Sequence, residues 1–171
     1  MTKQTITLPA FGSAIPGQGG IFAAIMRGPI ADGVEQAPYA LLVSDAAIGE
    51  IKGVAWGEYG KDVPGTSSRS NGRANTDAMA LANCPAALRV REICIDGHTD
   101  FFLPSLGELN SAAANVPELF NTDGWYWTST QCSRLNAFVQ AFEDGYSYWV
   151  IKGDEHRVRA FRAIPLELLN A

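Results

Sequence analysis

The sequence predicts an α+β fold that is rich in loops, on three observations. Short apolar runs bounded by Gly, Pro and Asp lie near the start, helical signals follow, and the residues from 125 onward alternate with a period of two. The chain has 171 residues, of which 47% are hydrophobic and 18% charged, and this suits a single domain over residues 1–171. Its 17 Gly and 9 Pro predict frequent turns.

Residues 1–60 are the predicted N-terminal β region. G-G-I-F-A-A-I-M-R-G (Gly19 to Gly28) and P-Y-A-L-L-V-S (Pro38 to Ser44) have the pattern of two paired strands joined by a polar loop. The segment from Ala55 to Asn75 combines several glycines with Ser, Thr, Asn and Arg and has no repeating apolar face. We expect a long ordered loop there.

Two helices are predicted in the middle of the chain. Asn75 or Thr76 is expected to cap the first, which Pro85 interrupts or restarts. The second begins at Ser105, because Ser105 and Glu108 have the spacing of a capping box, in which each side chain bonds the backbone amide of the other residue. Its buried stripe would contain Leu106, Leu109, Ala112 and Ala113, and Pro117 would mark its end.

Three strands are predicted at the C-terminal end, at residues 136–143, 146–151 and 156–164, connected as a meander. Asp144-Gly145 predicts a type I′ turn, in which both central residues take positive φ, and a second turn is expected near Lys152 to Asp154.

Composition excludes several classes of function. The net charge is −5 and the basic residues are scattered, so we expect no nucleic-acid partner. The start, M-T-K-Q-T-I-T-L-P, lacks the apolar region of a signal peptide, and no window reaches eighteen apolar residues. We therefore expect a soluble protein that is made in the cytoplasm without a signal peptide and does not insert into a membrane.

Candidates for catalysis or metal binding are few. His98 and His156 lie far apart in sequence, and no hydrolase, zinc or phosphate-binding signature accompanies them. Cys84, Cys94 and Cys132 form an odd set without CxxC spacing, which favours buried free thiols, with a Cys84–Cys94 bridge as the alternative. We expect no enzyme, no cofactor and no metal.

Four ordered motifs carry a family resemblance. They are G-H-T-D-F-F-L-P-S-L-G-E-L (Gly97 to Leu109), W-Y-W-T-S-T (Trp125 to Thr130), A-F-V-Q-A-F-E-D-G (Ala137 to Gly145) and R-V-R-A-F-R (Arg157 to Arg162). Together they resemble the Lcl C-terminal domain family, named after a bacterial collagen-like adhesin, over about residues 75–164.

The resemblance implies a C-type-lectin-like fold, in which two helices flank a twisted antiparallel sheet. Small members of the family occur in phages and prophages, and related lectin-like proteins serve as receptor-binding tips or as variable proteins of diversity-generating retroelements. The calcium motifs of sugar-binding C-type lectins, Glu-Pro-Asn and Trp-Asn-Asp, are absent from this sequence. At Gln140 the chain has a polar residue where the family has an apolar one, which leaves open which face of that strand is buried.

Several motif residues are expected to be structural. Trp127 and the hydroxyl residues 128–130 should build a platform, since buried polar groups tend to satisfy one another. Arg159 and Arg162 match the family motif and should pair with Asp100, Glu108 or another carboxylate.

A ligand-binding surface is predicted beside this platform. Alternation places Tyr146 and Tyr148 on one strand face and Trp149 and Ile151 on the other, so the tyrosines project outward if Trp149 faces inward. The alternative is that the tyrosines pack under the loop of residues 55–75. The predicted ligand-binding residues are Gln131, Ser133, Arg134, Asn136, Glu143, Tyr146, Tyr148 and Trp149.

These features and the resemblance lead to one functional hypothesis and one alternative. The hypothesis is a non-enzymatic adhesin of a phage or prophage, associated with the virion, that recognises a host cell-surface protein or glycan and that a retroelement diversifies. The alternative is a structural tail or baseplate subunit that makes contacts only with other phage tail proteins. A homo-oligomer such as a trimer is expected by analogy with phage fibres.

Overall fold

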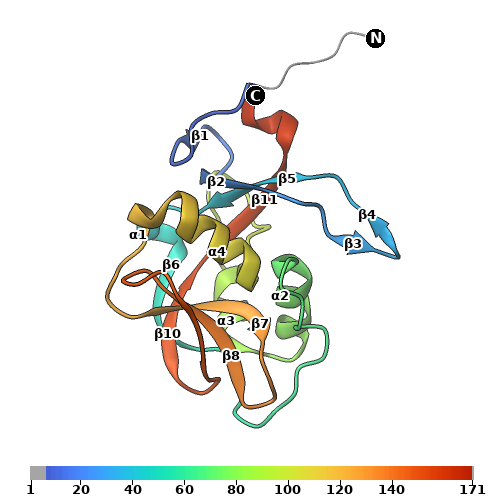
Figure 1. Ribbon diagram of the computed structural model, residues 1–171, viewed down its shortest axis with the longest axis vertical. Helices are drawn as coiled ribbons and strands as arrows, with labels where there is room; N and C mark the ends of the chain where they lie inside the picture. The colour runs from blue at the N-terminus through green and yellow to red at the C-terminus, as the bar shows by residue number, and fades with distance from the viewer. Residues whose placement is uncertain (1–6, 171) are drawn as a thin grey trace.

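The computed structural model describes residues 7–170, and this part of the chain confirms the α+β class. Two main sheets lie at an angle to each other, with helices packed between and beside them (Figure 1). A small two-stranded hairpin, β3 (Ile30–Ala31) with β4 (Val34–Glu35), projects from the first sheet.

The four-stranded sheet joins the beginning of the chain to its end. Its spatial order is β1 (Ala14–Ile15), β2 (Gly20–Met26), β5 (Tyr39–Val43) and β11 (Phe161–Pro165). β2 and β5 are antiparallel, which confirms the predicted pair of strands, and β11 pairs along the other side of β5. The five residues of β5 therefore lie between a strand from each half of the molecule, and Leu41 and Leu42 are fully buried.

The five-stranded sheet has a topology that the predicted meander does not describe. Its order is β6 (Glu50–Ala55), β10 (Glu155–Arg159), β7 (Trp125–Gln131), β8 (Asn136–Ala141) and β9 (Ser147–Ile151). β9 pairs with β8, but the chain then crosses to the far side of β7, where β10 runs parallel to β7 and antiparallel to β6. The meander was wrong, and the sheet is mixed rather than purely antiparallel.

The predicted strand 156–164 is two strands. Ala160 separates β10 from β11, and its amide donates to the Gly49 carbonyl at 2.9 Å. Phe161 then exchanges backbone hydrogen bonds with Phe102 and enters the other sheet. One strand ends and the next begins because each pairs with a different segment that is distant in the sequence. The local residue pattern contains no sign of these partners.

The helices are more numerous than predicted. Besides the short α1 (Ala46–Gly49), there are α2 (Gly72–Leu81), α3 (Pro85–Arg91) and α4 (Leu106–Asn115), and two 3₁₀ turns follow at Pro117–Leu119 and Leu166–Asn170. Pro85 restarts the helical path, as one of the two predicted alternatives has it.

α2 begins earlier than expected, so the predicted caps were wrong. Asn71 is the N-cap, and its side chain accepts a hydrogen bond from the Ala74 amide. Asn75 and Thr76 are instead buried inside the helix, where the Asn75 amide donates to Ser129 Oγ and the Thr76 hydroxyl bonds Leu103. Their polar side chains make tertiary contacts. In the sequence alone, the same residue types look like helix caps.

The capping box of α4 is confirmed. The Ser105 amide donates to Glu108 Oε2 at 2.7 Å, and the Glu108 amide donates to Ser105 Oγ at 3.4 Å. Leu106, Leu109 and Ala112 are buried as predicted, and the helix ends at Asn115, two residues before Pro117.

The turn after β8 differs from the expected type. Gly145 has a positive φ of 79°, but Asp144 is not among the residues with positive φ, so this is not a type I′ turn. The Ala141 amide donates to the Tyr146 carbonyl across a four-residue loop, and Asp144 Oδ1 accepts from the Tyr146 amide. The second expected turn is confirmed by the bond from the Asp154 amide to the Ile151 carbonyl.

The platform and the arginine pairs are confirmed. Trp127 is fully buried, and its indole N–H donates to the Val54 carbonyl at 2.8 Å. Arg162 pairs with Asp100, and Arg159 pairs with Glu50 at 3.0 Å. Gln140 is also buried and accepts from Ser147, so this position faces the interior despite its polarity.

Candidate functional site

β9 lies at the outer edge of the five-stranded sheet and carries most of the large exposed side chains of that sheet. On the strand Trp149 is 62% and Ile151 46% exposed, and Tyr146, directly before the strand, is 66% exposed. Large apolar side chains exposed on both faces of one edge strand mark that strand as a candidate contact surface. We call the set Trp125, Tyr146, Tyr148, Trp149 and Ile151 the aromatic edge.

One side of the aromatic edge is a pair of stacked rings. Trp125 on β7 and Tyr148 on β9 have ring centroids 5.8 Å apart and planes inclined by 28°. The Tyr148 hydroxyl donates to Asp144 Oδ2 at 2.5 Å, which fixes the ring on its outer side. This bond and the nearby carboxylate raise the pKa of Tyr148. Both rings are more than a third exposed, so they form a flat surface that a ligand can reach.

Trp149 lies on the opposite side of the sheet, beside Phe138 of β8, with which it is paired in register. The Arg69 guanidinium lies over the Phe138 ring, 5.4 Å from its centroid. This side therefore combines an exposed indole, a half-buried phenyl ring and a cation.

The condition under which the tyrosines project outward, that Trp149 faces inward, does not hold, because Trp149 is itself 62% exposed. Val150 contacts the core from the other face of the strand, while Trp149 and Ile151 are exposed. α4 covers the nearer end of this face, where Ser147 donates to Asn110, and leaves the position of Trp149 open. The alternative, that the tyrosines are sealed under the loop of residues 55–75, is wrong for Tyr146, which is largely exposed.

The predicted binding residues fall into two groups at opposite ends of the β8–β9 ribbon. Ser133, Arg134 and Asn136 are at the start of β8, whereas Glu143 and Tyr146 are in or after the turn that follows its end. At about 3.3 Å per residue, the six residues of β8 separate the groups by roughly 17–20 Å. Only Tyr146, Tyr148 and Trp149 of the predicted set belong to the aromatic edge.

Two of the predicted binding residues are used inside the molecule. Gln131 accepts from the Val63 amide and the Lys152 ammonium and donates to Asp62. Ser133 Oγ accepts from the backbone amides of Leu135 and Asn136 and so closes the loop between β7 and β8. Arg134 and Glu143 are exposed, and no ion pair of either occurs within residues 7–170.

Sequence reasoning missed Trp125, Ile151, Phe138 and Arg69 as parts of this surface. Trp125 begins a run of three aromatic residues, of which Tyr126 and Trp127 are fully buried whereas Trp125 is 37% exposed. The available signal was its position as the first residue of the strand, where alternation allows exposure. Arg69 lies in a distant loop, and no local pattern connects it to Phe138.

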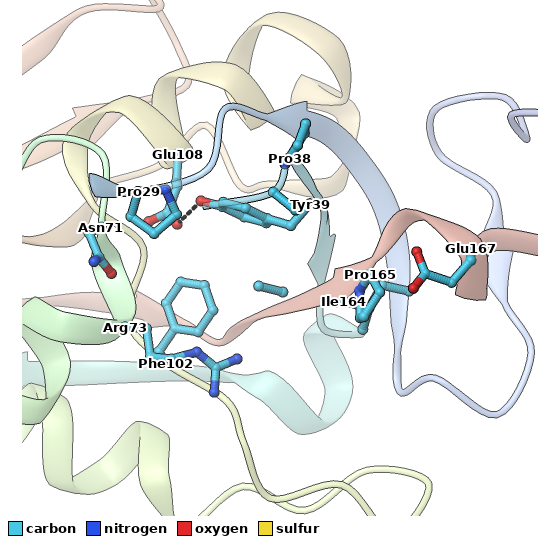
Figure 2. A pocket seen from close by; sticks show the side chains of 12 residues that line it. Pro29, Pro38, Tyr39, Asn71, Arg73, Phe102, Glu108, Ile164, Pro165 and Glu167 are labelled. Atoms are coloured by element: carbon cyan, nitrogen blue, oxygen red, sulfur yellow. Dashed lines mark hydrogen bonds between the residues drawn. The ribbon is translucent and has the colours of Figure 1, made fainter. Parts of the chain in front are cut away.

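A pocket of about 420 Å³ lies between β5, β11 and the start of α2, away from the aromatic edge (Figure 2). Its walls are mostly apolar, and Arg73 and Glu167 are on its rim. The other lining residues are Pro29, Ala37, Pro38, Tyr39, Asn71, Phe102, Glu108, Ala163, Ile164 and Pro165.

The polar floor of this pocket is satisfied internally. Tyr39 donates to Glu108 Oε1 at 2.6 Å, and Glu108 Oε2 accepts from Gly72 and Ser105. Burial raises the pKa of Glu108, and the four donors oppose that shift. Both carboxylate oxygens therefore stabilise the junction of β5, α2 and α4.

His156 on β10 is a titratable group in contact with the aromatic edge. Its ring centroid is 5.3 Å from that of Trp125 and 4.9 Å from that of Trp127. Its Nε2 atom is buried and has no hydrogen-bond partner in the described structure. Burial lowers the pKa of His156, and Asp154 opposes the shift, so the ring behaves as a neutral aromatic under the Trp125 surface.

The described residues contain neither a cluster of metal ligands nor a disulfide. Within residues 7–170, no group of three or more His, Cys, Asp or Glu side chains is placed to hold a metal ion. All three cysteines are free, so the alternative of a Cys84–Cys94 bridge is wrong, and only Cys84 is buried. The same part of the chain contains no helix with the length and apolar character to cross a bilayer.

This arrangement is an α+β scaffold that presents an aromatic strand at a sheet edge, and comparison with known proteins adds one fold-level likeness. No family model matches the sequence, and no curated protein does. A solved structure of a fimbrial protein from Bacteroides ovatus is similar over 92% of this chain, with a TM-score of 0.51 and 13% sequence identity. The chain spans about half of that protein, covering 48% of its length. The likeness is one of fold.

Proposed function

We propose that this protein is a non-enzymatic recognition module that binds a protein or glycan on a cell surface through the aromatic edge. The observation that carries this proposal is the exposure of Trp149 and Ile151 on a strand that ends a sheet, with the exposed Tyr146 directly before it. Rigid, amphipathic Trp and Tyr side chains are the residues that dominate binding surfaces. The likeness of fold to a fimbrial protein agrees with an adhesive or structural role at a surface.

Two finer parts of the proposal rest on the four sequence motifs. The first is that the scaffold is C-type-lectin-like and belongs with the Lcl C-terminal domain family. The second is that the protein is carried on a phage or prophage particle, where a retroelement diversifies it. A near copy of the coding segment for residues 125–162 beside the gene would support diversification, and its absence from the neighbouring DNA would count against it.

Binding of fluorescently labelled protein to a panel of bacterial cells and to a glycan array tests the proposal. Trp149→Ala should lower the affinity for the responding cells or glycan about tenfold or more, as truncation of a central aromatic anchor does. Leu81→Ala is the matched control, because Leu81 is 88% exposed on α2 and lies outside the aromatic edge. Equal binding by wild type and Trp149→Ala, with both folded, would exclude this surface.

A structural subunit is the second candidate, and the β3–β4 hairpin favours it. The hairpin projects from the four-stranded sheet, with Ile30 66% and Val34 61% exposed (Figure 1). If this hairpin contacts neighbouring subunits, Ile30→Ala with Val34→Ala should reduce self-association measured by light scattering and leave cell binding intact. A homo-oligomer that survives this double substitution would contradict the candidate.

A further inference from the structure

The outer edge of β9 offers unpaired backbone groups as well as side chains. The Tyr146 carbonyl accepts from Ala141 of β8, and the Lys152 amide donates to Leu135. Since partners alternate along an antiparallel strand, the even-numbered residues direct their N–H and C=O groups toward β8. The backbone groups of Ser147, Trp149 and Ile151 therefore point away from the sheet. Of these, the Ile151 carbonyl is taken by the Asp154 amide, which leaves three N–H and two C=O groups facing outward.

The other edges of the two main sheets are protected in ways that β9 is not. β6 is broken by Gly53, which has a positive φ of 67°, and by a register shift opposite β10. β1 has two residues, and β11 is paired at its start with Phe102 and ends at Pro165. Proteins commonly shield free edges with bulges, prolines, lysines or short strands. β9 is five residues long and reads S-Y-W-V-I, with none of these devices.

Acidic residues at both ends of the edge select against a second copy of this chain. Glu143 and Asp144 precede β9, Asp154 and Glu155 follow it, and all four are exposed. If two β9 strands paired antiparallel about Trp149, the acidic loop before β9 of one copy would approach the acidic residues after β9 of the other. Like charges brought close together oppose such a pairing.

The same charges favour a basic partner. Two carboxylates at each end of an apolar strand attract cationic side chains on both flanks of an incoming segment. At the Ile151 end, Lys152 follows β9 directly, but its ammonium is turned inward, where it donates to Gln131 and to the Lys61 carbonyl and lies near Asp62. Arg134, in the loop between β7 and β8, offsets one of the two exposed carboxylates at this end and leaves the other.

We propose that the edge of β9 takes up an extended segment of a partner polypeptide with an apolar or aromatic centre and basic residues on both sides. Backbone hydrogen bonds to Ser147, Trp149 and Ile151 would add this segment as a sixth strand of the sheet. At the spacing of about 4.8 Å between strands, its side chains would cover Trp149 on one face and Tyr148 on the other. This inference rests on the proposed function and identifies the ligand as a polypeptide.

Synthetic peptides supply the probe. One has the sequence Lys-Lys-Val-Thr-Val-Thr-Val-Lys-Lys, a second replaces the four lysines with glutamates, and a third is the lysine peptide with alternate backbone amides methylated. The lysine peptide should bind the wild-type protein, and the glutamate peptide should bind at least about tenfold more weakly at low salt, with a smaller difference at high salt because exposed charges are screened. Methylation of the edge-facing amides should abolish binding. Equal binding of the lysine and glutamate peptides, or of the methylated and unmethylated peptides, would overturn the inference.

A pair of substitutions tests the backbone contact from the protein side. The Ile151 N–H points outward, so Ile151→Pro removes a free donor without breaking a bond to β8, as prolines on edge strands do. Ile151→Ala removes the same side chain and keeps the donor. Ile151→Pro should bind the lysine peptide at least about fivefold more weakly than Ile151→Ala, since a lost backbone bond in a shielded contact costs about 1 kcal/mol.

The failure of this inference differs from the failure of the proposed function. If the wild-type protein binds no lysine peptide, or if Ile151→Pro and Ile151→Ala bind it equally well, the edge does not take up a strand. The proposed function still holds in that case if Trp149→Ala loses cell binding. If Ile151→Pro does not fold, the comparison of methylated and unmethylated peptides on the wild-type protein decides the question.

Discussion

The Trp125 indole stacks on the Tyr148 ring across β7 and β9, which are separated in the sheet by β8. The contact is fixed on one side by the bond from Tyr148 to Asp144 and supported on the other by His156 next to Trp125. The rings are therefore held in place before a ligand arrives, and a preorganised surface loses less conformational entropy on binding than a mobile one.

Tyr148→Ala and Tyr148→Phe separate the ring from the hydroxyl. Phenylalanine keeps the stack on Trp125 and loses only the bond to Asp144, so we expect a change in ligand affinity of about twofold or less. Alanine removes the stack and should weaken binding by about fivefold to tenfold, since aromatic contacts of this kind contribute about 1 kcal/mol. Titration of both variants with the responding ligand measures the difference, and equal losses would show that the hydroxyl, rather than the ring, matters.

Glu50 should be among the most sensitive positions for stability. Its carboxylate is 5% exposed and accepts from Arg157 at 2.9 Å, Arg159 at 3.0 Å and the Tyr126 hydroxyl at 2.7 Å. Glu50→Ala leaves the buried Arg159 without its counter-charge, and such changes lower the free energy of unfolding by about 3–5 kcal/mol. Urea denaturation measures this loss.

The Arg27–Glu35 pair provides the control for that experiment. It joins the ends of the projecting hairpin region at 2.7 Å, but both side chains are about half exposed or more. Surface pairs of this kind contribute little. Glu35→Ala should leave the urea midpoint unchanged, and a loss as large as that of Glu50→Ala would contradict the assignment of Glu50 as a buried hub.

His156 should make stability fall in mild acid. Burial lowers the pKa of His156 in the folded state below its ordinary value of 6.5, so the unfolded chain binds the proton more readily. The stability contributed by the neutral ring is present above pH 6.5 and is lost as the pH falls through 6.5 toward the lower folded-state pKa. Protonation of carboxylates also changes the stability in acid. The contribution of His156 is therefore measured against a variant that lacks this imidazole.

His156→Phe supplies that comparison. The phenyl ring can occupy the space beside Trp125 and Trp127 without titrating. The free energy of unfolding of the wild type should fall more than that of His156→Phe between pH 7 and pH 5, which urea denaturation at a series of pH values would show. Parallel curves for the two proteins would mean that the pKa of His156 is not lowered in the folded state.

Thiol labelling tests the packing independently of any ligand. Cys94 and Cys132 are exposed, whereas Cys84 is buried beneath the sheet, and burial raises the pKa of the Cys84 thiol. A thiol reagent added to the native protein should modify two cysteines and reach the third only after denaturation. Mass spectrometry counts the adducts, and rapid modification of Cys84 would contradict the packing of α3 against the five-stranded sheet.

Elements with local causes were predictable from the sequence. The box of Ser105 and Glu108 specifies the start of α4 through bonds three residues apart. The apolar runs of β2 and β5 are short, close in sequence and bounded by turn residues, so their pairing followed from the pattern.

Elements that depend on distant partners were not predictable. β6 contains Gly53 and Lys52 within a short run, and it becomes a strand because β10, a hundred residues later, pairs with it. The exposure of Trp149 follows from the position of β9 at the end of the sheet, and strand order has no signature in local alternation. The predicted binding residues were therefore grouped because they are close in sequence. In the structure they lie at the two opposite ends of the β8–β9 ribbon.

Hydrogen exchange of backbone amides, with and without the cell-surface ligand found by the binding screen, tests the central claim most directly. Saturating ligand should slow exchange in residues 147–151 of β9 and leave residues 30–35 of the β3–β4 hairpin unchanged. Slowed exchange in the hairpin with no change in β9 would contradict it and would place the contact surface in the N-terminal part of the molecule.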